Sequence, residues 1–145
     1  FKSLETLDVR MNQHSKSAKK IAEWLSKDKR VNTVYYPGLT SHPQYKLAMS
    51  QQKSGGALVS FEIKDPTNES AQARAWEIID NMTIFSRTGN LGDTRSTVTH
   101  PATTTHAKVE NKTKKLAGIT DGLIRLSIGL EDYEDLVLDL NDAMS

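Results

Sequence analysis

The stretch Gly122-Leu123-Ile124-Arg125-Leu126-Ser127-Ile128-Gly129 decides the fold, because it has the composition of a buried strand and carries one charge at its centre. It is rich in Ile and Leu and is bounded by glycine, a pattern that predicts a strand. Side chains alternate between the faces of a strand, so Arg125 shares one face with Leu123 and Ser127 and the other apolar residues occupy the opposite face. Because burying an unpaired arginine costs free energy, Arg125 must face water or an anion.

Two interpretations of Arg125 follow from strand geometry. It can be a surface arginine paired with a cross-strand acid such as Glu62, or it can be a clamp for a carboxylate ligand. The guanidinium fork matches a carboxylate with two parallel hydrogen bonds, and a strand is a rigid support for such a clamp. The strand pattern by itself leaves both interpretations open.

Composition restricts the class of protein. The chain has 145 residues, 37% hydrophobic and 26% charged, with a net charge of +1. These values indicate a single globular domain and argue against a dedicated nucleic-acid or membrane surface. The chain has no cysteine, so disulfides, thiolate zinc sites and cysteine nucleophiles are excluded. No apolar run is long enough to span a bilayer, and we expect a cytoplasmic protein.

Periodicity outside 122–129 predicts alternating helices and strands. The expected strands cover 31–36, 57–64, 84–87 and 96–99. The expected helices are a long amphipathic one over 3–27, a short one that begins at Ser41, His42 and Pro43 and ends near Gln51, and one over 111–116. Two more helices are expected, one capped by Thr67 or Asn68 and a final one opened by Glu131 and Asp132. This order indicates a two-layer α+β domain, a mainly antiparallel sheet with its helices on one face. The other face, with Ser60, Glu62, Arg125 and Ser127, is too polar for a core and should meet solvent, a partner domain or a ligand cleft.

The loop over 88–95 is a second candidate site. Its glycines let backbone N–H groups approach a ligand, and Asn90 can both donate and accept hydrogen bonds, although an ordinary surface turn has the same composition. His100 and His106 have no nearby pair of carboxylates, so we expect them to hydrogen-bond to the backbone rather than to bind metal. Thr103, Thr104 and Thr105 either cap a turn or line a cleft. The sequence contains no nucleophile elbow, phosphate-binding loop or dinucleotide fingerprint.

Several segments in order along the chain resemble one family. They are 4–14, Tyr35-Tyr36-Pro37-Gly38-Leu39-Thr40-Ser41-His42-Pro43, Ser54-Gly55-Gly56, Asn90-Leu91-Gly92-Asp93, His100-Pro101-Ala102-Thr103-Thr104-Thr105-His106 and Asp121-Gly122-Leu123-Ile124-Arg125-Leu126-Ser127-Ile128-Gly129-Leu130-Glu131-Asp132. Together they are similar to the C-terminal domain of the pyridoxal-phosphate enzymes of cysteine and methionine metabolism, which are fold-type I enzymes.

The resemblance implies roles for individual residues. By position, Arg125 grips the α-carboxylate of an amino-acid substrate. The Asn90-Leu91-Gly92 loop contributes beside it, with asparagine where the family pattern has serine, and Thr105 joins these substrate-binding residues. Arg95 is a basic partner for an anionic succinyl end of the substrate, or else a solvated surface arginine.

The resemblance also implies a reaction and a missing part. The loop and the His-Pro-Ala-Thr-Thr-Thr-His segment are closest to homoserine-ester sulfhydrylases, which make homocysteine from O-succinylhomoserine or O-acetylhomoserine and sulfide; a cystathionine γ-synthase, a cystathionine lyase or a methionine γ-lyase is the alternative. The catalytic lysine that holds pyridoxal phosphate would lie in an N-terminal domain. Residues 1–30 would then connect to that domain and residues 31–145 would form the substrate-binding domain of a homotetramer.

Since the chain opens at Phe1 without a capping residue, we expect a fragment of a longer enzyme, and no catalytic residue within it. We expect this polypeptide alone neither to bind pyridoxal phosphate nor to turn over substrate. A free-standing module that binds amino acids and regulates a partner is an alternative from another class.

Overall fold

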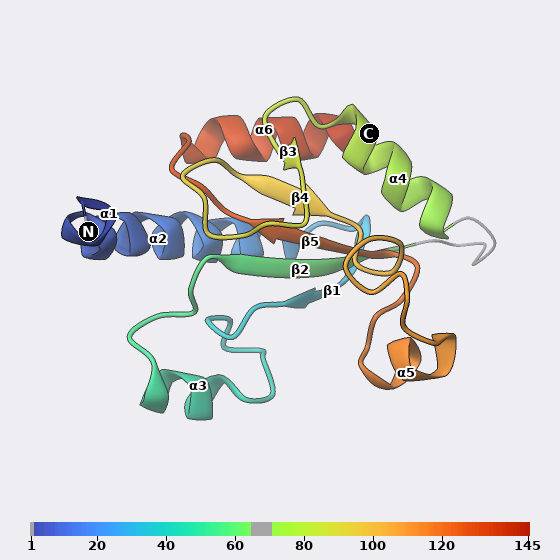
Figure 1. Ribbon diagram of the computed structural model, residues 1–145, viewed down its shortest axis with the longest axis horizontal. Helices are drawn as coiled ribbons and strands as arrows, with labels where there is room; N and C mark the ends of the chain where they lie inside the picture. Colours follow the sequence, from blue (N-terminus) through green and yellow to red (C-terminus); the bar gives the residue numbers. More distant parts are fainter. Residues whose placement is uncertain (1, 65–70) are drawn as a thin grey trace.

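The stretch around Arg125 forms β5 (Leu123–Ser127), the central strand of a five-stranded sheet with the order β1-β2-β5-β4-β3 (Figure 1). The computed structural model describes residues 2–64 and 71–145. The other strands are β1 (Val31–Tyr35), β2 (Leu58–Ile63), β3 (Ser86–Arg87) and β4 (Thr97–Thr99). Neighbouring strands are antiparallel except for β3 and β4, which are parallel. The predicted, mainly antiparallel sheet is therefore confirmed.

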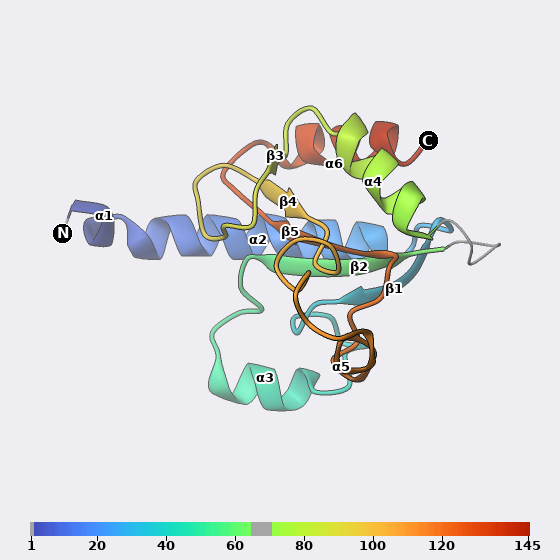
Figure 2. The same cartoon turned by 45° about the vertical axis from the view of Figure 1, so that its right-hand side comes forward.

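Three helices form the second layer, as the α+β prediction requires. They are α2 (Leu7–Leu25), α4 (Ala71–Asn81) and α6 (Tyr133–Ala143). The shorter helices are α1 (Lys2–Glu5), α3 (Tyr45–Gln51) and α5 (Asn111–Leu116). In both views α3 and α5 lie beyond the β1 edge of the sheet, away from this layer (Figures 1 and 2). No helix in the described part of the chain is long and apolar enough to cross a membrane.

The core lies between the sheet and the three long helices. Val59 and Phe61 of β2 and Ile124 and Leu126 of β5 are completely buried, as the alternation in both strands predicts. The helices contribute buried stripes that contain Ile21, Leu25, Ala75, Ile78, Ile79, Leu136 and Leu140. Burying each large apolar side chain stabilises the fold by about 1.5–3 kcal/mol. The sheet face opposite Arg125 is thus the one that the core occupies.

The boundaries of several elements differ from the predictions. The helix expected over 3–27 is broken at Thr6, whose ψ of 4° is not helical, and it ends at Leu25. The helix expected from Ser41, His42 or Pro43 begins only at Tyr45, because those residues form turns in which the Gln44 amide donates to His42 Nδ1 at 3.2 Å. The strand predicted over 84–87 is reduced to β3. The predicted cap at Thr67 or Asn68 lies outside the described residues.

Helix α2 is joined to the strand that carries Arg125. The buried ring of His14 lies with Nδ1 2.6 Å from the carbonyl oxygen of Ile128, just beyond the end of β5. On the same face of α2, Ala18, Ile21 and Leu25 are buried. This polar contact therefore fixes the position of the helix along the strand, in addition to the apolar packing.

The predicted apolar stripe of α2 continues toward the N-terminus and onto α1, where its side chains are exposed. Leu4, Leu7 and Met11 are exposed although they continue the stripe of Ala18, Ile21 and Leu25 at helical spacing. Helix α1 and the first turns of α2 project past the sheet in both views (Figures 1 and 2). The described residues leave this part of the amphipathic face without a packing partner.

Tyr36, directly after β1, is a buried tyrosine with a satisfied hydroxyl. Its Oη donates to the carbonyl oxygen of Gly56 at 3.0 Å and lies 3.4 Å from that of Ser15. Burial raises the pKa of Tyr36 to about 12, and the negative charge of Glu23 acts in the same direction. Since the unfolded phenol has a pKa near 10, the neutral form stabilises the native state below about pH 10. That stabilisation is lost as the pH rises from about 10 to about 12.

We expect one of the four tyrosines to ionise late in a spectrophotometric titration. Absorbance of the phenolate should show a component near pH 12, because Tyr36 resists ionisation while the protein is folded. Tyr36→Phe should remove that component and Tyr45→Phe should leave it in place. A late component that persists in Tyr36→Phe would contradict the assignment.

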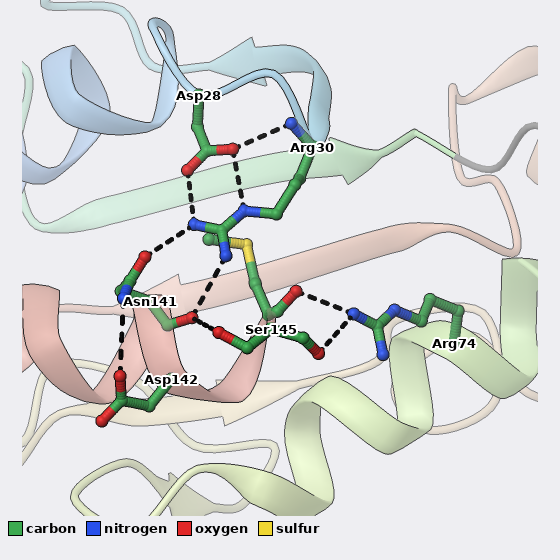
Figure 3. Close-up of polar contacts among 7 residues, drawn as sticks. Asp28, Arg30, Arg74, Asn141, Asp142 and Ser145 are labelled. Atoms are coloured by element: carbon green, nitrogen blue, oxygen red, sulfur yellow. Dashed lines mark hydrogen bonds and ion pairs between the residues drawn. The ribbon is translucent and has the colours of Figure 1, made fainter.

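Two arginines hold the C-terminal end of α6 from different elements (Figure 3). Arg30 forms a fork with Asp28, from Nη2 to Oδ2 at 2.7 Å and from Nε to Oδ1 at 3.0 Å, and also donates to the backbone and side-chain oxygens of Asn141. Arg74 of α4 donates to the carbonyl oxygens of Met144 and Ser145 at 2.7 and 3.1 Å. The last carbonyls of a helix have no partner within the helix, and Arg30 satisfies one of them at Asn141. Arg74 binds the two residues that follow the helix.

The Asp28–Arg30 pair should make stability depend on acid pH. Hydrogen bonds from the Arg30 side chain hold the pKa of Asp28 below its usual value. The contribution is therefore present above about pH 4 and is lost as the pH falls through the lowered pKa. We expect Asp28→Asn to lose about 1.5 kcal/mol of unfolding free energy at neutral pH, and the difference from the parent to shrink at about pH 3, in urea titrations. Asp142→Asn, whose carboxylate accepts only one 3.4 Å contact, is the matched control. A pH-independent difference for Asp28→Asn would refute the prediction.

Candidate functional site

Arg125 lies at the centre of a row of hydroxyl-bearing residues. The antiparallel registers place it directly opposite Ser60 on β2 and Thr99 on β4, and Ser60 is in turn opposite Tyr35 on β1. Residues directly opposite one another share a sheet face. No residue of this row is acidic, so the cross-strand positions supply no carboxylate for Arg125.

The ion pair with Glu62 is not formed. Glu62 is opposite Leu123 rather than Arg125, and its Oε2 accepts from Asn32 Nδ2 at 3.3 Å. Arg125 makes none of the salt bridges found within residues 2–64 and 71–145. Its one hydrogen bond runs from Nη2 to the carbonyl oxygen of Gly89, at 3.0 Å. The prediction of a cross-strand pair with Glu62 is therefore wrong, and the carboxylate clamp stays a prediction.

The loop over 88–95 lies over β4 and β5 on this face (Figures 1 and 2). The Gly92 amide donates to Ser127 Oγ at 3.0 Å, and Thr97 Oγ1 donates to the Asn90 carbonyl at 3.1 Å. The turn is completed by Asp93, which accepts from the Arg95 amide; that hydrogen bond, followed by one from the Thr94 hydroxyl, lowers the pKa of Asp93. Loop and strands are thus joined by hydrogen bonds rather than by apolar packing.

This covering corrects one prediction about the polar face. Over β1 and β2 the face is accessible, but Thr97, Thr99 and Ser127 are buried beneath the chain's own loops. Two further hydroxyl contacts lie there, Thr99 with Thr104 at 2.7 Å and Thr104 with the His100 carbonyl at 2.7 Å. The prediction that this face meets solvent, a partner domain or a ligand cleft is therefore wrong at Ser127.

The structure brings some of the predicted site residues together. Thr105 lies beside the loop, since a Cβ built on Gly89 would be 3.4 Å from Thr105 Cγ2, and Gly89 is bonded to Arg125. Asn90 and Leu91 follow directly, and Leu91 is 54% exposed. Arg95 is exposed, and within the described residues no hydrogen bond or ion pair joins its side chain to Arg125 or Thr105. The group therefore consists of Arg125, Thr105 and the Gly89–Leu91 backbone.

The two histidines are occupied by neighbouring groups. His100 is buried, with Nδ1 2.8 Å from Thr103 Oγ1 and Nε2 2.8 Å from the Asp121 carbonyl. His106 Nδ1 lies 2.9 Å from Thr105 Oγ1. Within residues 2–64 and 71–145 no group of three histidine or carboxylate side chains could hold a metal ion. Their contacts assign the histidines to the support of the 100–106 turn.

A cavity of about 360 Å³ lies behind the loop, between α4 and the 100–104 turn. It shares Thr88, Gly89 and Thr99 with the surroundings of Arg125. The rest of its wall consists of Trp76, Ile79, Asp80, Arg87, Val98, His100, Thr103 and Thr104. Asp80 and Arg87 form an ion pair on this wall. The cavity is mixed in character, with an apolar wall and several hydroxyl groups.

Comparison with known proteins identifies a family for this chain. The family model described as "Cys/Met metabolism PLP-dependent enzyme" matches residues 1–145, the whole chain. The chain belongs to the pyridoxal-phosphate-dependent enzymes of cysteine and methionine metabolism. The sequence resemblance to this family is confirmed, and the family is one of enzymes that depend on pyridoxal phosphate.

Individual members of this family differ in activity. The chain is 48% identical over 140 residues to an O-succinylhomoserine sulfhydrylase of Pseudomonas aeruginosa, covering 97% of this chain and 34% of that protein. It is 39% identical over 144 residues to an L-methionine gamma-lyase of Fusobacterium nucleatum, covering 99% and 35%. The chain thus spans about a third of the length of these relatives, and the family contains both transferases and lyases.

Solved structures of family members share the fold. A cystathionine gamma synthase from Xanthomonas oryzae in complex with cystathionine superposes with a TM-score of 0.89 at 42% identity, covering 99% of this chain and 36% of that one. A Campylobacter jejuni protein described as an O-acetylhomoserine (thiol)-lyase gives 0.91 at 39% identity, covering 99% and 33%. The latter carries N'-pyridoxyl-lysine-5'-monophosphate outside the matched region.

The surroundings of Arg125 do not fit the role of holding the family's cofactor. No lysine lines the cavity behind the loop, and none occurs in the row of Tyr35, Ser60, Arg125 and Thr99. A Schiff base with pyridoxal phosphate needs a lysine amine at the reacting centre. The surroundings of Arg125 therefore supply no amine for that bond, whereas its guanidinium has the chemistry to bind a carboxylate.

The residues that sequence reasoning missed are those that hold the loop. The sequence pattern does not indicate a role in the site for Thr97 or for the Gly89 carbonyl. It predicts for Ser127 only the strand face on which it lies. One signal was present, because Thr97, Thr99 and Ser127 place hydroxyls at alternate positions of two strands. Alternation predicts that these hydroxyls share a face, but it does not reveal the loop to which they bond.

Proposed function

We propose that this chain is the C-terminal, substrate-binding part of a pyridoxal-phosphate-dependent homoserine-ester sulfhydrylase. The reaction makes homocysteine from O-succinylhomoserine or O-acetylhomoserine and sulfide. The observation that carries the proposal is Arg125 on the central strand, which among residues 2–64 and 71–145 has no acidic partner and one hydrogen bond to a backbone carbonyl. Support for the sulfhydrylase comes from similarity to proteins of that name in Pseudomonas aeruginosa and Mycobacterium tuberculosis.

In this proposal Arg125 binds and orients the α-carboxylate of the substrate. The guanidinium keeps further N–H donors beyond the one bonded to Gly89, and two of them can receive a carboxylate side by side. Asn90, Leu91 and Thr105 line the same place through the loop backbone, an amide side chain and a hydroxyl. Arg95 would meet the anionic end of a succinyl ester. When Arg125 holds the substrate by its carboxylate, the substrate amine and the adjacent Cα–H bond take a defined direction. This orientation favours reaction.

The rest of the enzyme belongs to the proposal as well. Pyridoxal phosphate, held by an N-terminal domain, would supply the electron sink for the amino-acid chemistry. Residues 1–30 would connect to that domain, and 31–145 would bind substrate. The exposed Leu4, Leu7 and Met11 support this, since an uncovered apolar stripe needs a partner surface. A cytoplasmic homotetramer is the assembly that the family resemblance implies.

The decisive experiment is an assay of the full-length enzyme with pyridoxal phosphate. We expect homocysteine from a homoserine ester and sulfide at a higher kcat/KM than cystathionine from the same ester and cysteine. Faster use of cysteine would identify a γ-synthase, and release of a thiol from methionine without an ester would identify a lyase. A comparison of the succinyl and acetyl esters determines the acyl group.

A second experiment separates the proposal from a free-standing regulatory module. The 145-residue chain is titrated calorimetrically with O-succinylhomoserine and with methionine, and its visible spectrum is recorded after incubation with pyridoxal phosphate. We expect neither heat of binding nor a retained cofactor band. Tight binding of the amino acid without cofactor would favour the module.

A further inference from the structure

Three side chains on one sheet face bind three backbone positions of one loop. Arg125 donates to the carbonyl of Gly89, Thr97 donates to the carbonyl of Asn90, and Ser127 accepts from the amide of Gly92. The registers make this set compact. Thr97 is directly opposite Ser127, and Arg125 precedes Ser127 by two residues on the same strand. The loop backbone is therefore bound along its length by neighbouring side chains of β4 and β5.

The two residues whose hydroxyls bind the loop, Thr97 and Ser127, are buried. Thr97 is 4% and Ser127 is 2% exposed. The loop has little apolar packing in return, since Asn90 and Gly92 are exposed and Leu91 is half exposed. Removing either hydroxyl removes one of the hydrogen bonds that join the loop to the sheet, and such a bond contributes about 0.5–1.5 kcal/mol. The position of the loop therefore depends on these hydrogen bonds.

Gly92 explains why the loop can accept this arrangement. Its φ of +81° lies in the left-handed region, which residues with a side chain seldom adopt. The chain reverses there, and the Gly92 amide reaches Ser127 while the Asn90 carbonyl reaches Thr97. Both bonds hold the segment that begins at Gly89, the residue bonded to the guanidinium of Arg125.

We propose that Thr97 and Ser127 are positioning residues, which act on the substrate carboxylate by fixing the Gly89–Gly92 backbone against Arg125. This inference rests on the proposed function and deepens it. With the loop fixed, Gly89 occupies one Nη of Arg125 and directs the remaining N–H donors toward the carboxylate. With the loop released, the guanidinium samples more orientations, and substrate binding weakens in the ground state and transition state alike.

The test compares Thr97→Val with Thr97→Ser in the full-length enzyme. Valine keeps the shape and removes the hydroxyl, whereas serine keeps the hydroxyl. We expect Thr97→Val to raise KM for the homoserine ester about tenfold with kcat changed less than about twofold, the pattern of lost uniform binding. Thr97→Ser should stay within about twofold of the parent. Thr33→Val, on the same sheet face at β1 and outside the site, is the matched control.

A second readout does not need activity. Hydrogen–deuterium exchange of the peptide that contains residues 88–96 should accelerate about tenfold in Thr97→Val and in Ser127→Ala, but not in Thr33→Val or Thr97→Ser. If the full-length enzyme turns over no homoserine ester, the proposed function fails, and the exchange rates still decide whether the hydroxyls hold the loop. Unchanged exchange in Thr97→Val, or an equal rise of KM in Thr97→Val and Thr97→Ser, overturns the proposal.

Discussion

Replacing Arg125 by methionine lowers kcat/KM of the full-length enzyme for its homoserine ester by about a thousandfold. Methionine keeps an unbranched stem but removes the fork that binds the carboxylate, and charge-assisted hydrogen bonds of this kind contribute about 1.5–3 kcal/mol each. Arg125→Lys should have a kcat/KM between those of the parent and Arg125→Met, with a loss of about a hundredfold. The lysine ammonium is a point charge and cannot make both parallel hydrogen bonds. Steady-state kinetics with varied ester and saturating sulfide provide the measurement.

The Arg125 prediction needs a control for folding. The one hydrogen bond of Arg125 within the described residues is to Gly89, so thermal unfolding of Arg125→Met should resemble that of the parent. Arg10→Met removes an arginine of α2 whose side chain, within the described residues, bonds to Ser3 and Thr6, and it should keep full kcat/KM. Retention of activity within tenfold by Arg125→Met would remove the clamp from the mechanism.

The largest effect on stability is expected at Gly129, the second glycine that bounds β5. A Cβ at this position would lie closer than 3.0 Å to the Ser96 amide nitrogen, the Thr94 carbonyl and a carboxylate oxygen of Glu131. Two of these are backbone atoms that cannot move aside. They also take part in a network in which the Gly129 amide donates to Ser96 Oγ and the Ser96 amide to Glu131 Oε1.

Gly129→Ala should therefore lower the free energy of unfolding by about 3 kcal/mol, the upper part of the range for overpacked sites. Urea titration followed by circular dichroism measures it. Gly89→Ala is the matched control, since a Cβ there would meet only the Thr105 methyl group, at ordinary contact distance. Equal stability of the two variants would show that the Ser96–Gly129 contact is looser than the structure indicates.

The sheet and its core were predictable because they depend on local alternation. The strands around Phe61 and Ile124 alternate apolar and polar residues with a period of two, and both lie as predicted with their apolar sides in the core. Elements that depend on distant partners were placed less well. β3 is limited to the two residues that pair with β4, and residues 84 and 85 lie outside it. The helix breaks at Thr6 although the sequence has no glycine or proline there.

The site could be predicted only in part, for a related reason. Pattern located Arg125 on a strand, but whether Glu62 would pair with it depended on the register between β2 and β5. The loop could be recognised from its glycines, yet its position over Ser127 and Thr97 depends on hydrogen bonds between residues far apart in sequence. The arginines at the end of α6 were missed likewise, since Arg30 is 111 residues away from Asn141.

The bond between His14 and Ile128 has a mechanical consequence. It ties the middle of α2 to the strand end three residues beyond Arg125, while α1 and the first turns of α2 extend past the sheet (Figure 1). Because α2 is one continuous helix from Leu7 to Leu25, a partner surface that covers Leu7 and Met11 lies at a fixed distance from β5 and hence from Arg125.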